Sequence, residues 1–242
     1  MSLNNLKLLK YQGFNNISYQ IKAKEKKYVL RLFKSKKSVN ISRKFEYQAQ
    51  KKAYKKGFAA KPIFYSKEFM IYEYLKGIHK DVLEKKDIKN LAKIVKKLHK
   101  IELKTKSYNF EKDFKYYENI LKDDKNLSII NKSKTIFKKL KKYEKDLVLS
   151  HFDLNPKNII FKKDKIFIID WEYAGTNDRF FDLATICVEF NFNKKMQKLF
   201  LNSYFKKSKK YYFLKLKLYK KLYKNICLLW FSSIDGNLSK GN

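Results

Sequence analysis

Residues 150–158 have the sequence Ser150-His151-Phe152-Asp153-Leu154-Asn155-Pro156-Lys157-Asn158, and residues 168–173 have the sequence Ile168-Ile169-Asp170-Trp171-Glu172-Tyr173. The pattern is H-x-D-x-x-x-x-N, followed by an apolar segment that ends in aspartate. Kinase-type phosphoryl transfer uses these residue types in this order. One carboxylate accepts the proton of a hydroxyl group, while an amide and a second carboxylate hold Mg²⁺ against the phosphates of a nucleotide. The pattern predicts Asp153, Asn158 and Asp170 as catalytic residues, with Asn158 and Asp170 as the metal ligands.

The segment between the two motifs is predicted to be a β-hairpin. Residues 158–161 and 166–169 are apolar and β-prone, and a turn-like Lys-Lys-Asp-Lys sequence separates them. The two ends of a hairpin lie side by side, so Asn158 and Asp170 are expected within reach of one cation, and their oxygen atoms suit Mg²⁺. The alternative is an ordinary turn followed by a strand that ends in aspartate. The complete set around a hairpin favours the kinase-like site.

The composition indicates a globular protein. The chain has 242 residues, of which 44% are hydrophobic and 17% aromatic, enough for one large domain or two lobes with a core. No apolar run approaches the roughly 20 residues that span a bilayer, and the N-terminal sequence has no signal-peptide core. Cys187 and Cys227 are the only cysteines, too few for a disulfide framework. These features predict a cytoplasmic protein without a membrane span.

The formal charge of +35 raises the possibility of a nucleic-acid partner. Nucleic-acid-binding proteins gather Arg and Lys on one face. Here the excess is nearly all lysine, spread from end to end, and the only arginines are Arg31, Arg43 and Arg179. We interpret the charge as a solvated lysine coat, and no nucleic-acid partner is expected. The sequence does not indicate an oligomeric state.

The N-terminal region is predicted to be a small antiparallel sheet with one helix. Residues 19–23 and 28–33 alternate as strands, and the Gly- and Asn-containing segment before them, which includes Asn16, can present backbone N–H groups to phosphates.

Arg31 lies mid-strand among apolar neighbours and needs a partner. A helix over residues 42–55, with Ser42 as N-cap and Gly57 as its stop, supplies Glu46. A strand cation paired with a helix glutamate positions phosphates in kinases; a surface ion pair is the alternative.

Two more strands follow, at residues 62–65 and 69–75, and the second runs into Gly77. A strand followed by such a break suits a hinge between lobes, where the backbone from Glu73 to Leu75 can bond an adenine edge. The predicted division is therefore an N-lobe over residues 1–75 and a C-lobe over residues 76–242.

The remaining sequence is predicted to be mostly helical. Apolar residues recur at helical spacing behind Asp87, the expected cap. His99 is interpreted as a packed core residue, and residues 108–147 as helical. Asp182 is expected to cap a helix that carries Glu189. From residue 194 onward the spacing is again helical, with a core stripe formed by Tyr219, Leu222, Tyr223, Ile226 and Trp230. The predicted fold class is α+β, with a small sheet-and-helix N-lobe and a helical C-lobe.

The sequence resembles the choline/ethanolamine kinase family, within the aminoglycoside-phosphotransferase group that shares the two-lobed protein-kinase-like fold. The resemblance rests on the two motifs above and on four further segments: Gly13-Phe14-Asn15-Asn16, Tyr28-Val29-Leu30-Arg31, Arg43-Lys44-Phe45-Glu46 and Phe181-Asp182-Leu183-Ala184. It implies a phosphate loop at Asn16, a phosphate contact at Arg31 and a general base at Asp153. It also implies that Asp182 supports the catalytic loop.

The same resemblance implies a pocket for a quaternary ammonium group. Tyr173, Glu189 and Trp230 are the implied contacts, and Glu172 is a further candidate substrate-binding carboxylate. Aromatic faces attract a trimethylammonium group by about 0.5–2 kcal/mol per ring. The family often has a second tryptophan where this chain has Cys227, which leaves a smaller amino alcohol open as the acceptor.

The sequence therefore predicts a kinase that uses ATP and Mg²⁺ to phosphorylate the hydroxyl group of a small amino alcohol, with choline as the first candidate. An aminoglycoside phosphotransferase is the alternative enzyme, although the lysine-rich C-terminal region suits a polycationic substrate poorly. The alternative from another class is a basic nucleic-acid-binding protein with an inactive kinase-like fold, which would bind nucleic acid with a steep dependence on salt.

Overall fold

The computed structural model describes residues 6–10, 12–13, 15–34, 41–103, 105 and 107–238. The chain forms two compact units. The first contains the chain up to Leu83 together with Asp153–Ala174, and the second contains Glu84–Phe152 and the chain from Gly175 onward. This partition differs from the predicted division at residue 75, because the catalytic hairpin groups with the N-terminal sheet. The predicted α+β class is confirmed.

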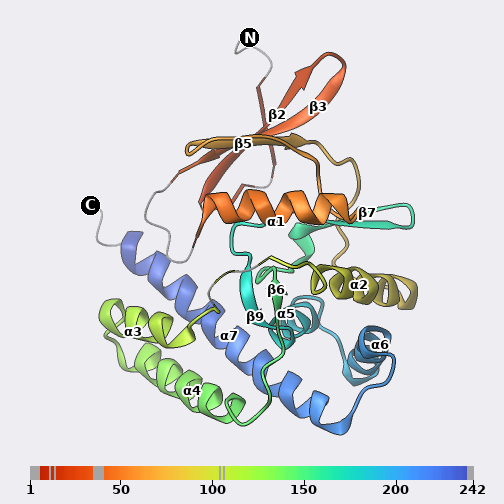
Figure 1. Ribbon diagram of the computed structural model, residues 1–242. Coiled ribbons are helices and arrows are strands. Elements are labelled where there is room, and N and C mark those ends of the chain that lie inside the picture. Colours follow the sequence, from red (N-terminus) through yellow and green to blue (C-terminus); the bar gives the residue numbers. More distant parts are fainter. Residues whose placement is uncertain are drawn as a thin grey trace. The chain divides into compact units, whose positions relative to one another are not determined.

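The first unit is built on a five-stranded antiparallel sheet of order β1-β2-β3-β5-β4. Its strands are β1 (Lys7–Leu8), β2 (Asn16–Ala23), β3 (Lys26–Phe33), β4 (Pro62–Tyr65) and β5 (Phe69–Glu73). β2 and β3 are longer than predicted, because Lys24 and Glu25 both adopt positive φ values, of 45° and 61°, and close the hairpin in two residues. Helix α1 (Arg43–Lys55) lies along this sheet (Figure 1).

Both predicted ends of α1 are confirmed. The Ser42 side chain accepts a hydrogen bond from the backbone N–H of Phe45 at 3.3 Å. Gly57 has a φ of +83°, a left-handed conformation that stops a helix and favours glycine. Ala49 and Ala53 are fully buried, and so is Glu46. A charged side chain buried in this way needs partners, which the site supplies.

The predicted catalytic hairpin is confirmed. Strands β7 (Ile159–Lys162) and β8 (Lys165–Ile168) are antiparallel, and the 3₁₀ turn η2 (Pro156–Asn158) precedes them. Two backbone contacts join this hairpin to the N-terminal part of its unit: Ile78 and Phe161 exchange hydrogen bonds of 2.9 and 2.8 Å, and Ile168 donates to the carbonyl of Phe58 at 2.8 Å. These contacts explain why the hairpin groups with the sheet.

Gly77 makes the contact between the segment after β5 and strand β7 possible. A Cβ atom at this position would lie 2.4 Å from Cγ2 of Ile160 and 2.7 Å from the carbonyl oxygen of Phe161. We therefore expect Gly77→Ala to lower the free energy of unfolding by about 1–3 kcal/mol, as overpacking does. Urea unfolding of the two proteins measures the difference, with the exposed Lys76→Ala as the matched control. An unchanged midpoint for Gly77→Ala would contradict the close contact.

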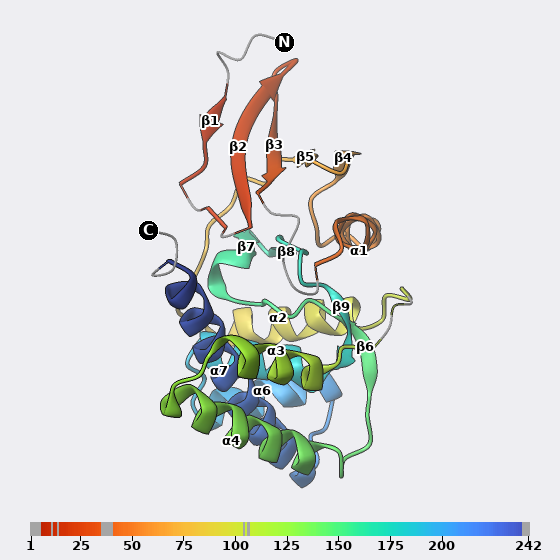
Figure 2. The ribbon, with the colours of Figure 1, turned by 90° about the vertical axis from the view of Figure 1, so that its left-hand side faces the viewer.

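The second unit is helical, with one two-stranded ribbon of β6 (Leu147–Ser150) and β9 (Gly175–Asp178). Its helices are α2 (Lys85–Leu98), α3 (Phe110–Ile120), α4 (Asp124–Leu140), α5 (Phe180–Glu189), α6 (Lys194–Phe205) and α7 (Lys210–Leu238). The long helix α7 packs against α4 and α5, which are labelled in Figure 1, and Figure 2 shows α4 and α7 from another side. Its predicted core stripe is buried at Tyr219, Leu222 and Tyr223 and half-buried at Ile226 and Trp230.

Two predicted helix caps are wrong. Helix α2 begins at Lys85, so Asp87 lies inside its first turn, where it accepts the N–H of Glu84 at 3.3 Å. Helix α5 begins at Phe180, and it is Asp178, not Asp182, that accepts the N–H of Phe180, at 3.0 Å. Aspartate is favoured both at the cap and in the first turn, so composition alone does not separate the two positions.

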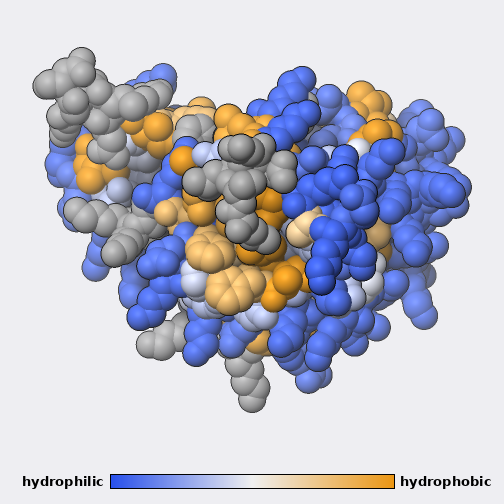
Figure 3. Space-filling model, turned by 90° about the horizontal axis from the view of Figure 1, so that it is seen from above, coloured by the Kyte–Doolittle hydropathy of each residue, from blue (hydrophilic) through white to orange (hydrophobic). Residues whose placement is uncertain are grey.

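The face seen in Figure 3 is largely hydrophilic, with a smaller group of hydrophobic residues among the hydrophilic ones. Within the described part of the chain, no helix combines the length and the apolar character that a membrane crossing requires.

Candidate active site

Both carboxylate oxygens of Asp153 accept hydrogen bonds from asparagine side chains of the first unit. Asn158 Nδ2 donates to Oδ2 of Asp153 at 2.7 Å and to its carbonyl oxygen at 2.9 Å, and Asn155 Nδ2 donates to Oδ1 at 2.8 Å. Because Asn158 donates with its nitrogen, Oδ1 is the atom that it offers to a cation. Burial, and then the charge of Asp170, raise the pKa of Asp153 to about 7, and a group of this kind is well matched to proton transfer near neutral pH.

Asp170 follows strand β8 and has a φ of 65°, in the left-handed region that aspartate rarely adopts. Strained positions of this kind gather at functional sites, where the surrounding contacts hold them. Here Arg31 Nη2 contacts Oδ1 of Asp170 at 2.5 Å. Ile169 donates its N–H to the carbonyl of Asn158 at 3.0 Å. The hairpin therefore brings the Asn158 and Asp170 segments side by side, as the sequence predicts.

Arg31 is 3% exposed and faces three carboxylates. Its Nη1 lies 3.1 Å from Oε1 of Glu46, and its Nη2 lies 2.5 Å from Asp170 and 3.2 Å from Oε2 of Glu172. The ion pair predicted between Arg31 and Glu46 is therefore present. Burial raises the pKa of Glu46, and the charges of Arg31 and then Arg43 oppose the rise.

Three buried polar atoms of this cluster have no hydrogen-bond partner among the described residues: Nε of Arg31, Oδ1 of Asn16 and Oε1 of Glu46, the last of which lies 3.1 Å from Nη1 of Arg31 as an ion pair. Buried polar atoms are nearly always satisfied. An unsatisfied guanidinium N–H suits an anionic ligand such as a phosphate group.

Glu172 and Asn16 join the same cluster. Glu172 is 6% exposed, and its Oε2 accepts from Asn16 Nδ2 at 2.7 Å and from Arg43 Nη1 at 3.1 Å. Its Oε1 accepts from Asn15 Nδ2 at 3.3 Å. This carboxylate is engaged by donors of its own unit, so the geometry favours a structural role over the substrate contact that the sequence predicts for it. Tyr173 is half-buried, and its hydroxyl accepts from Asn15 Nδ2 at 2.9 Å.

Three residues that contact the predicted site residues were not themselves predicted from the sequence: Asn15 and Arg43, which bond Glu172, and Asn155, which bonds Asp153. The rarity of arginine in this chain could have marked Arg43 as a candidate site residue. Asn15 lies in the predicted phosphate loop, but Phe14 of that loop lies outside the described residues.

In the second unit, Asp182 supports the backbone that leads into the catalytic loop. Its Oδ2 accepts the N–H of His151 at 2.8 Å, and its Oδ1 accepts the N–H of Phe152 at 2.9 Å. His99 Nε2 lies 3.0 Å from Oδ2 of the same carboxylate. Phe152 has a φ of 71°, so these bonds hold a left-handed residue immediately before Asp153. His99 is buried, as expected for a core residue.

Glu189 and Trp230 also belong to the second unit. Glu189 ends helix α5, and Tyr223 of α7 donates its hydroxyl hydrogen to Oε1 of Glu189 at 2.8 Å. Both Glu189 and Trp230 are half-buried. Trp230 follows Tyr223 by seven residues, two turns of helix, so the two aromatic side chains share one face of α7.

The predicted adenine-binding segment, Glu73 to Leu75, begins at the last residue of strand β5. The N–H of Glu73 donates to the carbonyl of Lys61 at 2.9 Å, and the N–H of Tyr74 donates to the carbonyl of Lys27 at 3.0 Å. These two donors are engaged inside the sheet. The groups that this segment would offer to an adenine edge are therefore the carbonyl of Glu73 and the N–H of Leu75.

The residues that the sequence predicts as metal ligands form a small set of donors. Among the described residues, no three or more His, Cys, Asp or Glu side chains gather in a way that could hold a metal ion. Mg²⁺ in nucleotide enzymes uses one or two carboxylates and takes its other ligands from phosphates and water. One carboxylate (Asp170) and one amide oxygen (Asn158) fit that donor set.

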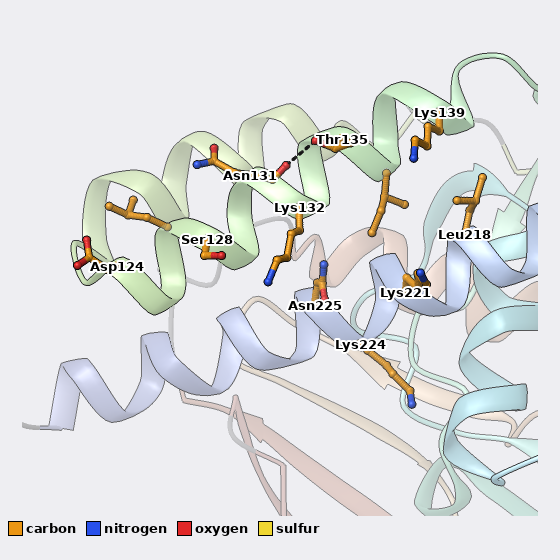
Figure 4. A pocket seen from close by; sticks show the side chains of 12 residues that line it. Asp124, Ser128, Asn131, Lys132, Thr135, Lys139, Leu218, Lys221, Lys224 and Asn225 are labelled. Carbon is orange, nitrogen blue, oxygen red and sulfur yellow. Dashed lines mark hydrogen bonds between the residues drawn. The ribbon is translucent and has the colours of Figure 1, made fainter.

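A separate groove of about 840 Å³ lies between α4 and α7 of the second unit (Figure 4). Lys132 extends from α4 toward α7, and Lys139, Lys221 and Lys224 also line the groove. Lysine and arginine contribute 58 of the 242 residues, so several lysines around a hollow are expected on any face of this chain and do not by themselves indicate a ligand.

The α+β architecture, with its antiparallel sheet, its helical second unit and the Asp153–Asn158–Asp170 arrangement, defines a protein of the protein-kinase-like fold. A family model described as choline/ethanolamine kinase matches residues 9–233. The chain therefore belongs to the choline/ethanolamine kinase family.

Individual relatives agree with this assignment. A protein LicA homolog of Mycoplasma capricolum subsp. capricolum is 29% identical over 148 residues, which cover 61% of this chain and 62% of that protein. The crystal structure of choline kinase LicA from Streptococcus pneumoniae matches with a TM-score of 0.81 and 23% identity, over 98% of this chain and 87% of that chain. A spectinomycin phosphotransferase structure matches with a TM-score of 0.66 and 16% identity, over 96% and 82% of the two chains. At these identities the structural matches establish the fold.

Proposed function

We propose that this protein is an ATP-dependent kinase that phosphorylates the hydroxyl group of a small amino alcohol, with choline as the first candidate. The observation that carries the proposal is the carboxylate of Asp153, oriented by Asn155 and Asn158 in the loop that precedes the β7–β8 hairpin, while Asp170 follows the same hairpin. Family membership supports the reaction class, and the likeness to choline kinase LicA from Streptococcus pneumoniae supports choline. The proposal includes a cytoplasmic location, where ATP is available.

In the proposed reaction, Asp153 aligns the acceptor hydroxyl and accepts its proton while the oxygen attacks the γ-phosphorus in line. The bond between the γ-phosphorus and the bridging oxygen of the β-phosphate breaks on the opposite side, and ADP leaves with that oxygen. Asn158 Oδ1 and the Asp170 carboxylate would hold Mg²⁺, which supplies positive charge to the phosphate oxygens when bound. The two asparagines keep the Asp153 carboxylate in one orientation, so the catalytic oxygen needs little rearrangement. Positioning of this kind accounts for much of the rate in phosphoryl transfer.

The nucleotide would bind along the first unit. Arg31 supplies a guanidinium whose Nε is unsatisfied, and Glu46 holds that guanidinium in place. The Asn16 segment supplies the phosphate loop, and the Glu73 carbonyl with the Leu75 N–H forms the adenine contact. An adenine edge offers one donor and one acceptor side by side, which suits this carbonyl and N–H.

The ammonium group of the acceptor would be bound by Glu189 and the aromatic faces of Trp230 and Tyr173. A carboxylate and aromatic rings attract a quaternary ammonium by Coulomb and cation–π terms. Tyr223 fixes one oxygen of Glu189, which leaves the other oxygen for the cation.

A coupled assay of ADP release tests the proposal. Choline or ethanolamine should stimulate ADP release in the presence of Mg²⁺, whereas kanamycin-type aminoglycosides should not. Stimulation by an aminoglycoside alone would assign the alternative enzyme. Absence of stimulation by any small hydroxyl compound, together with salt-sensitive binding of RNA or DNA, would overturn the kinase proposal in favour of a nucleic-acid-binding protein.

Glu189→Gln should raise the KM for the amino alcohol and leave the KM for ATP unchanged. Loss of the carboxylate charge removes a Coulomb contact to the cation, and we expect a rise of about 10-fold, equivalent to about 1.4 kcal/mol. Steady-state kinetics with each substrate varied in turn measures the effect. The matched control is Glu25→Gln, which removes one exposed carboxylate in the β2–β3 turn. An equal rise in both KM values would exclude Glu189 from the acceptor site.

A further inference from the structure

Arg43 is the second arginine of the buried cluster, and no role has been assigned to it above. It is the first residue of helix α1, and its side chain is 12% exposed. Nη1 donates to Oε2 of Glu46 at 2.9 Å and to Oε2 of Glu172 at 3.1 Å. Nη2 donates to the carbonyl of Asn15 at 3.3 Å, and the guanidinium carbon lies 4.2 Å from the centroid of the Phe33 ring.

These contacts join three segments that are distant in the sequence. Asn15 belongs to the loop before β2, Glu46 to α1, and Glu172 to the segment two residues after Asp170. The Phe33 ring supports the face of the guanidinium while its edge bonds the three acceptors. Arg43 therefore ties the loop that is proposed to contact phosphates to the strand end that is proposed to hold the metal ion.

The charges of the cluster require this second cation. Glu46, Asp170 and Glu172 all lie within 3.2 Å of Arg31. Without Arg43, three carboxylates would share a single buried guanidinium, and an uncompensated buried charge is costly. With Arg43 present, Glu46 and Glu172 each contact two guanidinium groups, which leaves Arg31 oriented toward Asp170.

Lysine cannot replace this geometry. A guanidinium presents donors on two nitrogens in a fixed planar fork, whereas an ammonium group is a compact charge on a flexible stem. Only a guanidinium group can donate to the carboxylates of Glu46 and Glu172 through one nitrogen and to the Asn15 carbonyl through the other, while its face stacks on the Phe33 ring.

We propose that Arg43 is a positioning residue for the nucleotide: it fixes the Asn15 loop and the Glu172 segment to each other, and thereby sets the affinity for Mg²⁺-bound ATP without contributing to acceptor binding. This inference deepens the proposed function and rests on it. It also assigns Glu172 to the nucleotide half of the reaction.

The test measures binding of a non-hydrolysable ATP analogue with Mg²⁺ and without acceptor, by calorimetry, for the wild type, Arg43→Lys and Arg43→Gln. Arg43→Lys should weaken nucleotide binding by about 10-fold to 100-fold, as loss of charged hydrogen bonds does, and Arg43→Gln should weaken it at least as much. The KM for the acceptor should change less than twofold. Lys44→Gln, which removes an exposed charge from the same helical turn, is the control and should bind the analogue as the wild type does.

Glu172→Gln keeps the shape of its side chain, so it tests the proposal even where the Arg43 variants fold poorly. It should weaken nucleotide binding and leave the KM for the acceptor unchanged. Wild-type affinity in Arg43→Lys, or a Glu172→Gln variant that raises only the KM for the acceptor, would overturn the inference. A wild-type protein that does not bind the analogue would instead overturn the proposed kinase function, so the two failures are distinguishable.

Discussion

Asp153→Asn is expected to lower turnover by about 10²–10⁴-fold, the range that a general base contributes. The substitution keeps the size and shape of the side chain but removes the oxygen charge that accepts the hydroxyl proton. Asn155 and Asn158 now donate to both carboxylate oxygens, so an amide at residue 153 also places its own NH₂ group against one of these donors. Steady-state ADP release with saturating ATP and acceptor measures the loss.

Nucleotide binding separates loss of the base from loss of the fold in this experiment. Asp153→Asn should bind the ATP analogue within a few-fold of the wild type, because the proposed nucleotide contacts lie on other residues. Asp81→Asn, at an exposed position of the same unit, is the matched control and should retain full turnover. Near-normal turnover in Asp153→Asn would remove this residue from the mechanism.

The part of the site that was predictable from the sequence is the part encoded locally. Asp153, Asn158 and Asp170 lie within 18 residues of one another, and the hairpin between them follows from alternating apolar strands and a charged turn. The Arg31–Glu46 pair was predictable for a different reason, because a charge in the middle of an apolar strand must find a partner nearby.

The contacts of Glu172 were not predictable in this way. Its partners Asn16, Arg31 and Arg43 precede it by 129 to 156 residues, and no local pattern specifies a contact at that separation. A glutamate two residues after an aspartate that is predicted to bind a metal ion fits a substrate contact as well as a buried ion pair. Burial and the positions of the donors decide between these roles, and only the fold supplies them.

The role of Asp182 was also only partly predictable from the sequence. The sequence predicts a cap, and the resemblance to a kinase family implies a support for the catalytic loop. The predicted cap is wrong, because α5 begins two residues before Asp182. The contacts expected of a loop support are present, because the Asp182 carboxylate accepts the backbone N–H groups of His151 and Phe152. An aspartate in the first helical turn can face its own helix or another segment, and packing decides which.

Asp182→Asn is therefore expected to lower the free energy of unfolding by about 3–5 kcal/mol, as loss of one partner from a buried ionic cluster does. Three donors converge on the two carboxylate oxygens: the N–H groups of His151 and Phe152, and His99 Nε2. An asparagine offers one acceptor oxygen and turns an NH₂ group toward a donor. The left-handed conformation of Phe152 then loses its support, so turnover should also fall.

The pH dependence of unfolding identifies the ionised carboxylate as the source of this stability. Burial alone would raise the pKa of Asp182, but the hydrogen bond and charge of His99 and the N–H of His151 hold the pKa below its ordinary value. A lowered pKa in the folded state stabilises the protein fully above the unfolded pKa of about 4. This contribution is lost as the pH falls through the folded pKa. Urea unfolding at pH 7 should show the full difference between the wild type and Asp182→Asn, and the difference should shrink below about pH 4. A difference that is the same at both pH values would mean that the carboxylate charge does not hold the catalytic loop.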